Sequence, residues 1–284
     1  MARYVADLHL HSTASDGTDS PAEVVRRATG KGLRVIALTD HDTVAGLAEA
    51  RDAGKELGVE VVAGVELTCY VGKREVHVLG YGIHPRDESL LMHCERFQAA
   101  RRIRAREIGD RLASAGAPID MEQVMANADA GVVGRPHIAR ALLEAGHVSS
   151  WQEAFDRFLA DGSPANVPKL LITPRQCVEV IHDAGGLAVM AHPGLNNQLD
   201  LVPLLRDAGC DGIEVWHSAH SEHTTYRLQV MALDQGMLAT GGSDCHGAMK
   251  EGGPLLGEWG LGKASWEKVE RALRGRQAGA LQAL

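Results

Sequence analysis

Residues 7–12 read Asp-Leu-His-Leu-His-Ser and end the first apolar run of the chain. If the chain from Val5 to His11 is extended, alternation with a period of two places His9 and His11 on the same side of a strand. Two imidazoles aimed in one direction make half of a transition-metal site. Two buried histidines bonded to backbone carbonyls would give the same pattern, so the rest of the chain must decide.

Composition limits the classes of protein to consider. The 284 residues are 45% hydrophobic and 23% charged, as in ordinary globular proteins. The net charge of −8 disfavours a surface that coats nucleic acid, but bound metal ions would still attract an anionic substrate. The first residues lack the apolar core of a signal peptide, and five scattered cysteines suit reduced thiols. We therefore expect a cytoplasmic protein without a membrane span.

Short β-type runs alternate with helical runs through most of the chain. We predict seven strands, at residues 3–9, 34–39, 59–67, 75–83, 187–191, 212–216 and 238–241. Repeated strand–helix units imply parallel strands with right-handed crossovers, and seven strands favour a closed or nearly closed barrel. From about residue 88 to residue 160 only helical patterns occur. We predict a barrel from residues 1–87 and 166–284, with residues 88–165 as a helical insertion that caps the substrate.

Polar residues recur near the predicted strand ends. They are His9, His11, Asp16, His41, Glu66, His77, His192, Asp244 and His246. Taken singly, such residues are commonly helix caps or satisfied core residues, and Asp42 and Thr43 are expected to be caps. Together they are hard to explain by packing, because buried ionisable groups are costly unless they are paired or bind a metal.

Nine candidate ligands are too many for one ion. The set indicates two or three divalent ions, with Mn²⁺, Fe²⁺ or Zn²⁺ favoured by the mixed histidine and carboxylate donors. Glu66 or Asp244 is a natural bridge between ions. Such ions activate a shared water and stabilise the oxygens of an in-line displacement, which is chemistry suited to a phosphoryl centre.

The segments DLHLHS, SDGT, TDHD, AHP and SDCH, with Glu66 and His77 between them, resemble the PHP (polymerase and histidinol phosphatase) family. The resemblance implies a distorted (β/α)7 barrel with a trinuclear metal site, in which Mn²⁺ is the expected metal. Under it, His9 and His11 hold one ion, with Glu66 and Asp244 bridging or completing its shell. Glu66, His77 and His192 hold a second ion, and Asp16, His41 and His246 hold a third.

The helical insertion, with the segment Gly134–Arg140, is similar to that of the nucleotide-directed branch of this family. This similarity implies a phosphatase that removes the 3′-phosphate of a 3′,5′-nucleoside bisphosphate such as pAp, through a metal-bridged hydroxide. The alternatives are a 5′–3′ exonuclease on short RNA, a histidinol-phosphatase-like phosphomonoesterase, and a non-catalytic PHP binding module. A small phosphorylated nucleotide or short RNA is the expected partner, and no obligatory protein partner is evident.

Several residues are candidates for the remaining roles. Arg135 begins a predicted helix and is expected to bind phosphate, as is Lys169 where the chain re-enters the barrel. One of His217, His220 and His223 should face the site, and we favour His220 as a contact to phosphate or the leaving group. Asp244, His192 and His220 are the predicted catalytic residues. Asp7 shares the parity of His9 and is expected to orient an imidazole from outside the metal shell.

Overall fold

The computed structural model describes residues 4–127, 133–160, 162–167, 170–247 and 256–282. The chain forms two compact units. The barrel unit comprises Met1–His93 and Leu171–Leu284, and the helical unit comprises Cys94–Leu170. No helix among the described residues is both long enough and apolar enough to span a membrane.

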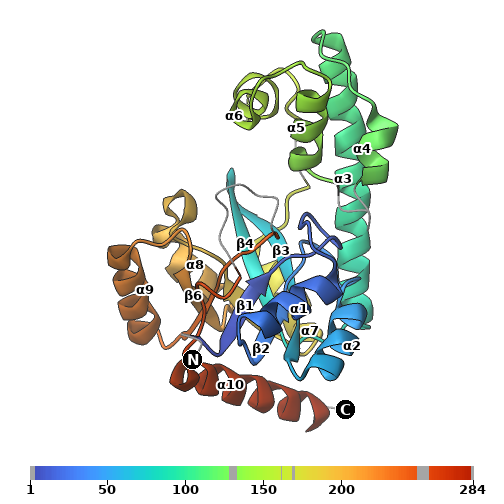
Figure 1. The fold of residues 1–284 in the computed structure, drawn as a ribbon. Helices are drawn as coiled ribbons and strands as arrows, with labels where there is room; N and C mark the ends of the chain where they lie inside the picture. Colours follow the sequence, from blue (N-terminus) through green and yellow to red (C-terminus); the bar gives the residue numbers. More distant parts are fainter. Residues whose placement is uncertain (1–3, 128–132, 161, 168–169, 248–255, 283–284) are drawn as a thin grey trace. The chain divides into compact units, whose positions relative to one another are not determined.

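One seven-stranded sheet forms the barrel unit, with the strands in sequence order (Figure 1). The strands are β1 (Ala6–Leu10), β2 (Val35–Leu38), β3 (Glu60–Val71), β4 (Arg74–Tyr81), β5 (Leu187–Met190), β6 (Gly212–His217) and β7 (Leu238–Gly242). A parallel bridge between Leu10 and Cys245 joins the first strand to the segment after the last. The sheet is therefore a nearly closed barrel, which confirms the predicted fold class.

The expectation that every strand is parallel is wrong at β4. This strand pairs antiparallel with both β3 and β5, whereas the other neighbouring strands are parallel. Only Gly72 and Lys73 separate β3 from β4, and Gly72 has a φ of 61°. Two residues suffice for a hairpin but not for a crossover. His77, near the start of β4, therefore lies at the face where the parallel strands end.

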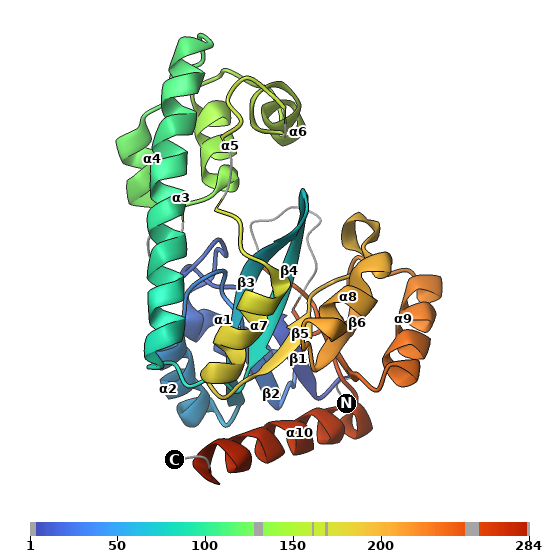
Figure 2. The same ribbon diagram turned by 180° about the vertical axis from the view of Figure 1, so that it is seen from behind.

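Helices of the barrel unit lie around the sheet, as Figures 1 and 2 show. They are α1 (Pro21–Gly30), α2 (Leu47–Leu57), α7 (Pro174–Asp183), α8 (Val202–Asp207), α9 (Glu222–Asp234) and α10 (Lys263–Gln282), with short 3₁₀ turns at Leu195–Asn197 and Leu199–Leu201. As predicted, Ser20 caps α1, because its side chain accepts a hydrogen bond from the Glu23 N–H. Asp42 does not cap α2, which starts later than expected. Its carboxylate instead accepts a hydrogen bond from the Thr68 N–H.

The core of the barrel lies toward the end where the parallel strands begin. Leu8, Tyr81 and Val189 from the strands belong to one buried cluster with Trp266 and Val269 of α10. Figure 1 shows α10 running across this end of the barrel. An apolar plug at one end leaves the opposite face for the polar strand ends, as in other barrels of alternating strands and helices.

The helical unit has a hydrophobic core of its own. Its elements are the greater part of α3 (Glu88–Ser114), then α4 (Met121–Asn127), α5 (Arg135–Glu144), α6 (Trp151–Ala154) and the π-helical turn Phe155–Leu159. Ile108, Leu112, Ile138 and Leu142 are at most 2% exposed within this core. Arg104 of α3 donates a hydrogen bond to the Val167 carbonyl, which fixes the returning segment to the long helix.

Candidate metal centre

Glu66 lies at the centre of the polar face of the barrel and is fully buried in β3. Five imidazoles surround its carboxylate. Nitrogens of His9, His11 and His41 lie 3.3, 3.2 and 3.2 Å from Oε2, and nitrogens of His77 and His192 lie 2.9 and 3.1 Å from Oε1. These histidines come from β1, the segments after β1, β2 and β5, and β4. One carboxylate among five nitrogen donors suits a residue that bridges ions.

Asp244 forms a second focus, just after β7. Its Oδ1 lies 3.2 Å from His11 Nε2 and 3.5 Å from His9 Nε2. The backbone of Asp244 has a φ of 56° and that of His192 a φ of 27°. Both values lie in the left-handed region that residues other than glycine rarely adopt. A hydrogen bond from the Asp244 N–H to the His9 carbonyl fixes the first of them. Local strain at two candidate ligands is typical of a functional site.

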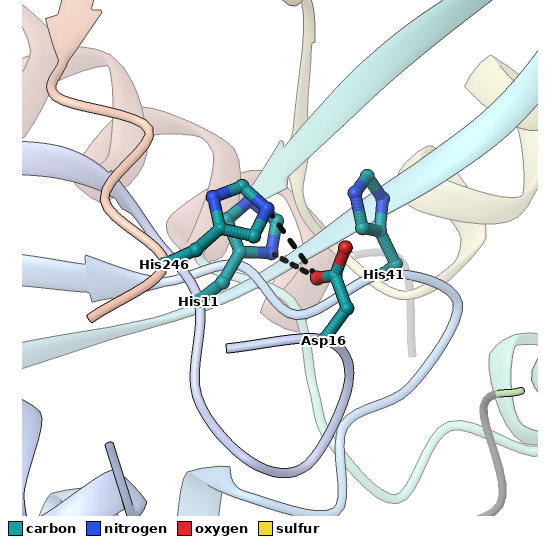
Figure 3. A group of neighbouring side chains, drawn as sticks. All are labelled: His11, Asp16, His41 and His246. Atoms are coloured by element: carbon teal, nitrogen blue, oxygen red, sulfur yellow. Dashed lines mark ion pairs between the residues drawn. The ribbon is translucent and has the colours of Figure 1, made fainter. Parts of the chain in front are cut away.

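Asp16 organises a third group, which Figure 3 shows. Its Oδ1 lies 3.3 Å from His246 Nε2 and 3.9 Å from His11 Nδ1. His41 completes this group, whose four ligand atoms all lie within 4.8 Å of one another. Glu66, Asp244 and Asp16 thus each gather imidazoles at one face, and all nine predicted metal ligands take part.

The unsatisfied nitrogens of this face fit metal ions. Both ring nitrogens of His11 and Nδ1 of His41 are buried and make no hydrogen bond within the described structure, although carboxylate oxygens lie nearby. A buried polar atom without a partner costs roughly 1–3 kcal/mol. Nitrogens that converge on carboxylates without hydrogen-bond geometry are placed as ligands of a shared cation would be. The donor set suits Mn²⁺, Fe²⁺ or Zn²⁺.

The pKa values of the clustered side chains also indicate that this face needs positive charge. Burial lowers the pKa of His41 to about 3 and also lowers the pKa of His192, which keeps these imidazoles neutral. Burial alone would raise the pKa of Glu66, but His41, His77 and His9 together hold it well below its usual value. The pKa of His11 rises to about 10 despite burial, because the carboxylates of Asp244 and Glu66, each 3.2 Å from its Nε2, favour its cation. The carboxylates therefore require positive charge beside them, which bound cations would supply in place of protons.

Glu214 was not among the predicted site residues. It is fully buried in β6, and its Oε1 lies 3.1 Å from His9 Nδ1. A carboxylate accepts here, so His9 Nδ1 carries a proton, and its Nε2 is directed at Glu66 and Asp244, where a ligand of a shared cation would lie. The signal in the sequence was an acidic residue in the middle of the apolar run Gly212–Trp216.

Asp7 does not have the role that we predicted. Its carboxylate accepts hydrogen bonds from the backbone N–H groups of Ser243 and Gly257 at 2.9 Å, and a longer one of 3.4 Å from that of His9. It contacts no imidazole among the described hydrogen bonds. Burial raises the pKa of Asp7 to about 6, since these bonds offset only part of the lost hydration. Asp7 fixes the backbone around β1 and β7, and Glu214 orients the ring of His9.

His220 also differs from the prediction. Its Nδ1 donates to the Val215 carbonyl at 2.9 Å, and its Nε2 accepts from the Gly194 N–H at 3.0 Å. Both ring nitrogens thus contact backbone groups, which leaves neither of them for the predicted contact to phosphate. His217 is the residue of this segment that reaches the cluster, with Nε2 at 3.4 Å from Asp244 Oδ2.

Of the two remaining predicted substrate ligands, the structure describes one. Arg135 is the first residue of α5, where it donates to the Leu159 carbonyl and lies over the Phe155 ring. Lys169 lies outside the described residues. The phosphate-binding roles of both residues stay predictions.

Curated relatives match most of the chain. A 5′–3′ exoribonuclease of Haemophilus influenzae is 39% identical over 248 residues, covering 84% of this chain and 89% of the relative. A phosphoribosyl 1,2-cyclic phosphate 1,2-diphosphodiesterase of Eggerthella lenta is 34% identical, covering 86% and 94%. A 3′,5′-nucleoside bisphosphate phosphatase of Chromobacterium violaceum is 36% identical, covering 88% and 90%.

A crystal structure agrees with these matches. It is assigned to a metal-dependent phosphoesterase of Bifidobacterium adolescentis, with a TM-score of 0.84, 32% identity, and coverage of 94% of this chain and 95% of that one. The PHP domain family matches residues 7–157, which is more than half of the chain. The chain therefore belongs to the PHP domain family, and it is a metal-dependent phosphoesterase.

Proposed function

We propose that this enzyme removes the 3′-phosphate of 3′,5′-nucleoside bisphosphates, converting pAp to AMP and inorganic phosphate. The observation that carries the proposal is the group of three carboxylates, each gathering imidazoles, on one face of a phosphoesterase barrel. The similarity to a bisphosphate phosphatase over about nine-tenths of each chain supports this substrate.

The chain contributes a rigid set of electron-pair donors to the reaction. Glu66 and Asp244 stay ionised, and His41 and His192 stay neutral, so oxygen and nitrogen lone pairs face one another across the site. We propose Asp16, Glu66 and Asp244, with the six histidines of the predicted set, as ligands of two or three Mn²⁺ ions. When bound, such ions activate water and offset the charge on the phosphoryl oxygens.

Catalytic and positioning roles divide among these residues. We propose that Asp244 and His192 act in the reaction as metal ligands, held in their strained backbone conformations by the neighbouring strands. His220 helps to position His192, because its Nε2 accepts a hydrogen bond from the N–H of Gly194, two residues after His192. A substrate that enters this face therefore meets side chains whose positions are already fixed.

The test is a phosphate-release assay on the purified protein with Mn²⁺. The substrates are pAp, 3′-AMP, 5′-AMP, histidinol phosphate and a 5′-phosphorylated RNA trimer. The proposal requires pAp to be turned over fastest, with AMP and inorganic phosphate as the products. A preference for histidinol phosphate would remove the nucleotide assignment. Absence of both turnover and bound transition metal would favour a non-catalytic binding module.

A 5′–3′ exoribonuclease is the second candidate, because a relative with that activity is 39% identical to this chain. The two activities differ in products. A monoesterase releases inorganic phosphate from pAp, whereas an exonuclease releases nucleoside monophosphates stepwise from the RNA trimer. Chromatography of the products in the same assay therefore distinguishes them, and a higher kcat/KM for the trimer would select the exonuclease.

We further propose that the helical unit caps the substrate and that Arg135 binds one of its phosphates. Arg135 is the first residue of α5, where the helix dipole also favours an anion. The Arg135→Ala variant should raise KM for pAp about tenfold while leaving the metal content unchanged. Arg140→Ala, an exposed position on the same helix, is the matched control. An unchanged KM in Arg135→Ala would remove this role.

A further inference from the structure

His217 is the last residue of β6 and lies inside the metal centre, although the ligands predicted from the sequence did not include it. Its ring lies close enough to His9 and Glu214 for the three to form a candidate metal group. The residue is 2% exposed. Its ring centroid lies 5.9 Å from that of His9 and 5.4 Å from that of His192. Its Nε2 points toward Asp244, with 3.4 Å between Nε2 and Oδ2. His217 is therefore in the innermost layer of the site.

A backbone hydrogen bond fixes the tautomer of this ring. The Ala219 N–H donates to His217 Nδ1 at 3.0 Å, so the lone pair of Nδ1 is in use. A neutral imidazole with an accepting Nδ1 carries its hydrogen on Nε2. That nitrogen can donate a hydrogen bond, but it has no lone pair for a metal ion. His9 has the opposite arrangement, since a carboxylate faces its Nδ1.

The donor is buried and has no acceptor of suitable geometry. His217 Nε2 makes no hydrogen bond within the described structure, and the nearest carboxylate, Asp244, is itself a candidate metal ligand. The Asp244 side chain is 20% exposed, so a ligand can reach the region beside Nε2. A phosphoryl group bound at this face would present oxygens that accept hydrogen bonds and carry negative charge.

We propose that His217 donates a hydrogen bond from Nε2 to a phosphoryl oxygen of the substrate. The residue then acts as a catalytic hydrogen-bond donor rather than as a metal ligand. This inference rests on the proposed phosphomonoester hydrolysis but not on the identity of the nucleotide. It makes His217, and not His220, the residue after β6 that contacts phosphate.

Two substitutions separate the functions of the two ring nitrogens. In His217→Asn, the amide oxygen can replace Nδ1 as acceptor for the Ala219 N–H, but no donor reaches the position of Nε2. In His217→Gln, the longer amide can place an N–H near the position of Nε2. Removal of one donor to a developing oxyanion typically lowers kcat by about 10²–10³-fold. We expect a loss of about 100-fold in His217→Asn and of less than tenfold in His217→Gln.

The measurements are kcat and KM with p-nitrophenyl phosphate and with pAp, the inhibition constant of inorganic phosphate, and the metal content. His217→Asn should weaken inhibition by phosphate about tenfold and keep the wild-type metal content. A lower metal content would overturn the proposal in favour of a ligand role. Equal losses in both variants, or wild-type kcat in His217→Asn, would also overturn it. If the wild-type enzyme hydrolyses p-nitrophenyl phosphate but not pAp, the nucleotide assignment is rejected. The inhibition constant of inorganic phosphate in wild type and His217→Asn would then still test the role of His217.

Discussion

Two groups of histidines meet at the polar face of the barrel and use their ring nitrogens in opposite ways. His9 and His246 hold Nδ1 against an oxygen, that of Glu214 for the first and of the Asp244 carbonyl for the second. Their Nε2 atoms therefore face the carboxylates of the site. His217 and His220, after β6, each accept a hydrogen bond from a backbone N–H. The comparison shows that the group facing one ring nitrogen, a side chain for His9 and backbone for the others, fixes what the second nitrogen can present to the site.

Loss of the central carboxylate should have the largest effect. Glu66→Gln keeps the shape of the side chain but removes the charge that faces five imidazoles, so we expect most of the bound metal to be lost and kcat to fall by about 10³-fold. Elemental analysis and the phosphate-release assay measure the two quantities. Glu60→Gln, exposed at the start of the same strand, is the control. Full activity in Glu66→Gln would contradict the assignment of this face as the metal centre.

Removal of metal should abolish activity and also lower stability. A ligand that binds only the folded protein stabilises it by about 2.7 kcal/mol at 100 times its Kd. For a domain of this size the corresponding shift in Tm is roughly 5–10 °C. We expect the chelated protein to melt lower by that amount and to regain both Tm and turnover with Mn²⁺. A Tm that does not respond to metal would be inconsistent with ions bound among buried groups.

Most of the fold could be predicted from the sequence, because alternating apolar runs, caps such as Ser20 and positive-φ glycines act locally. The reversed direction of β4 could not be predicted from periodicity. An antiparallel strand has the same alternation as a parallel one, and only the two residues between Val71 and Arg74 indicated the hairpin.

The candidate site was predictable only in part, because a sequence shows where residues lie along the strands but not which groups their side chains contact. The residues that gather at Glu66 all lie near strand ends, which a sequence shows. The roles of Asp7, His217 and His220 depend instead on which backbone groups reach their side chains, and that of Glu214 depends on the ring of His9. The contact of Glu214 joins segments as far apart as His9 and Glu214, which no spacing along the chain encodes. The contacts of His217 and His220 are local, but they depend on the turn that follows β6.

Substitution of Glu214 tests how the first group of histidines is oriented. In the wild-type protein, Glu214 Oε2 accepts a hydrogen bond of 2.9 Å from the His192 N–H. Glu214→Gln keeps one oxygen as acceptor for His9 Nδ1 but places an amide N–H against the His192 N–H. We expect metal affinity to fall about 10–100-fold, as for other residues that orient a ligand from outside the metal shell. Titration with Mn²⁺ should restore most of kcat. Glu222→Gln, exposed on α9, is the control, and an unchanged Mn²⁺ affinity would show that His9 needs no orienting carboxylate.

His220→Ala should have the smallest effect on chemistry and thereby sharpens the contrast with His217. The substitution leaves the Val215 carbonyl and the Gly194 N–H without their partner, and each buried group left unpaired costs roughly 1–3 kcal/mol. We expect the free energy of unfolding to fall by about 2 kcal/mol, with unchanged metal content and a kcat within tenfold of wild type. Urea unfolding and the phosphate-release assay measure these quantities, with the exposed His223→Ala as control. A loss of kcat as large as that of His217→Asn, at unchanged stability, would instead return His220 to the phosphate-binding role that the sequence suggested.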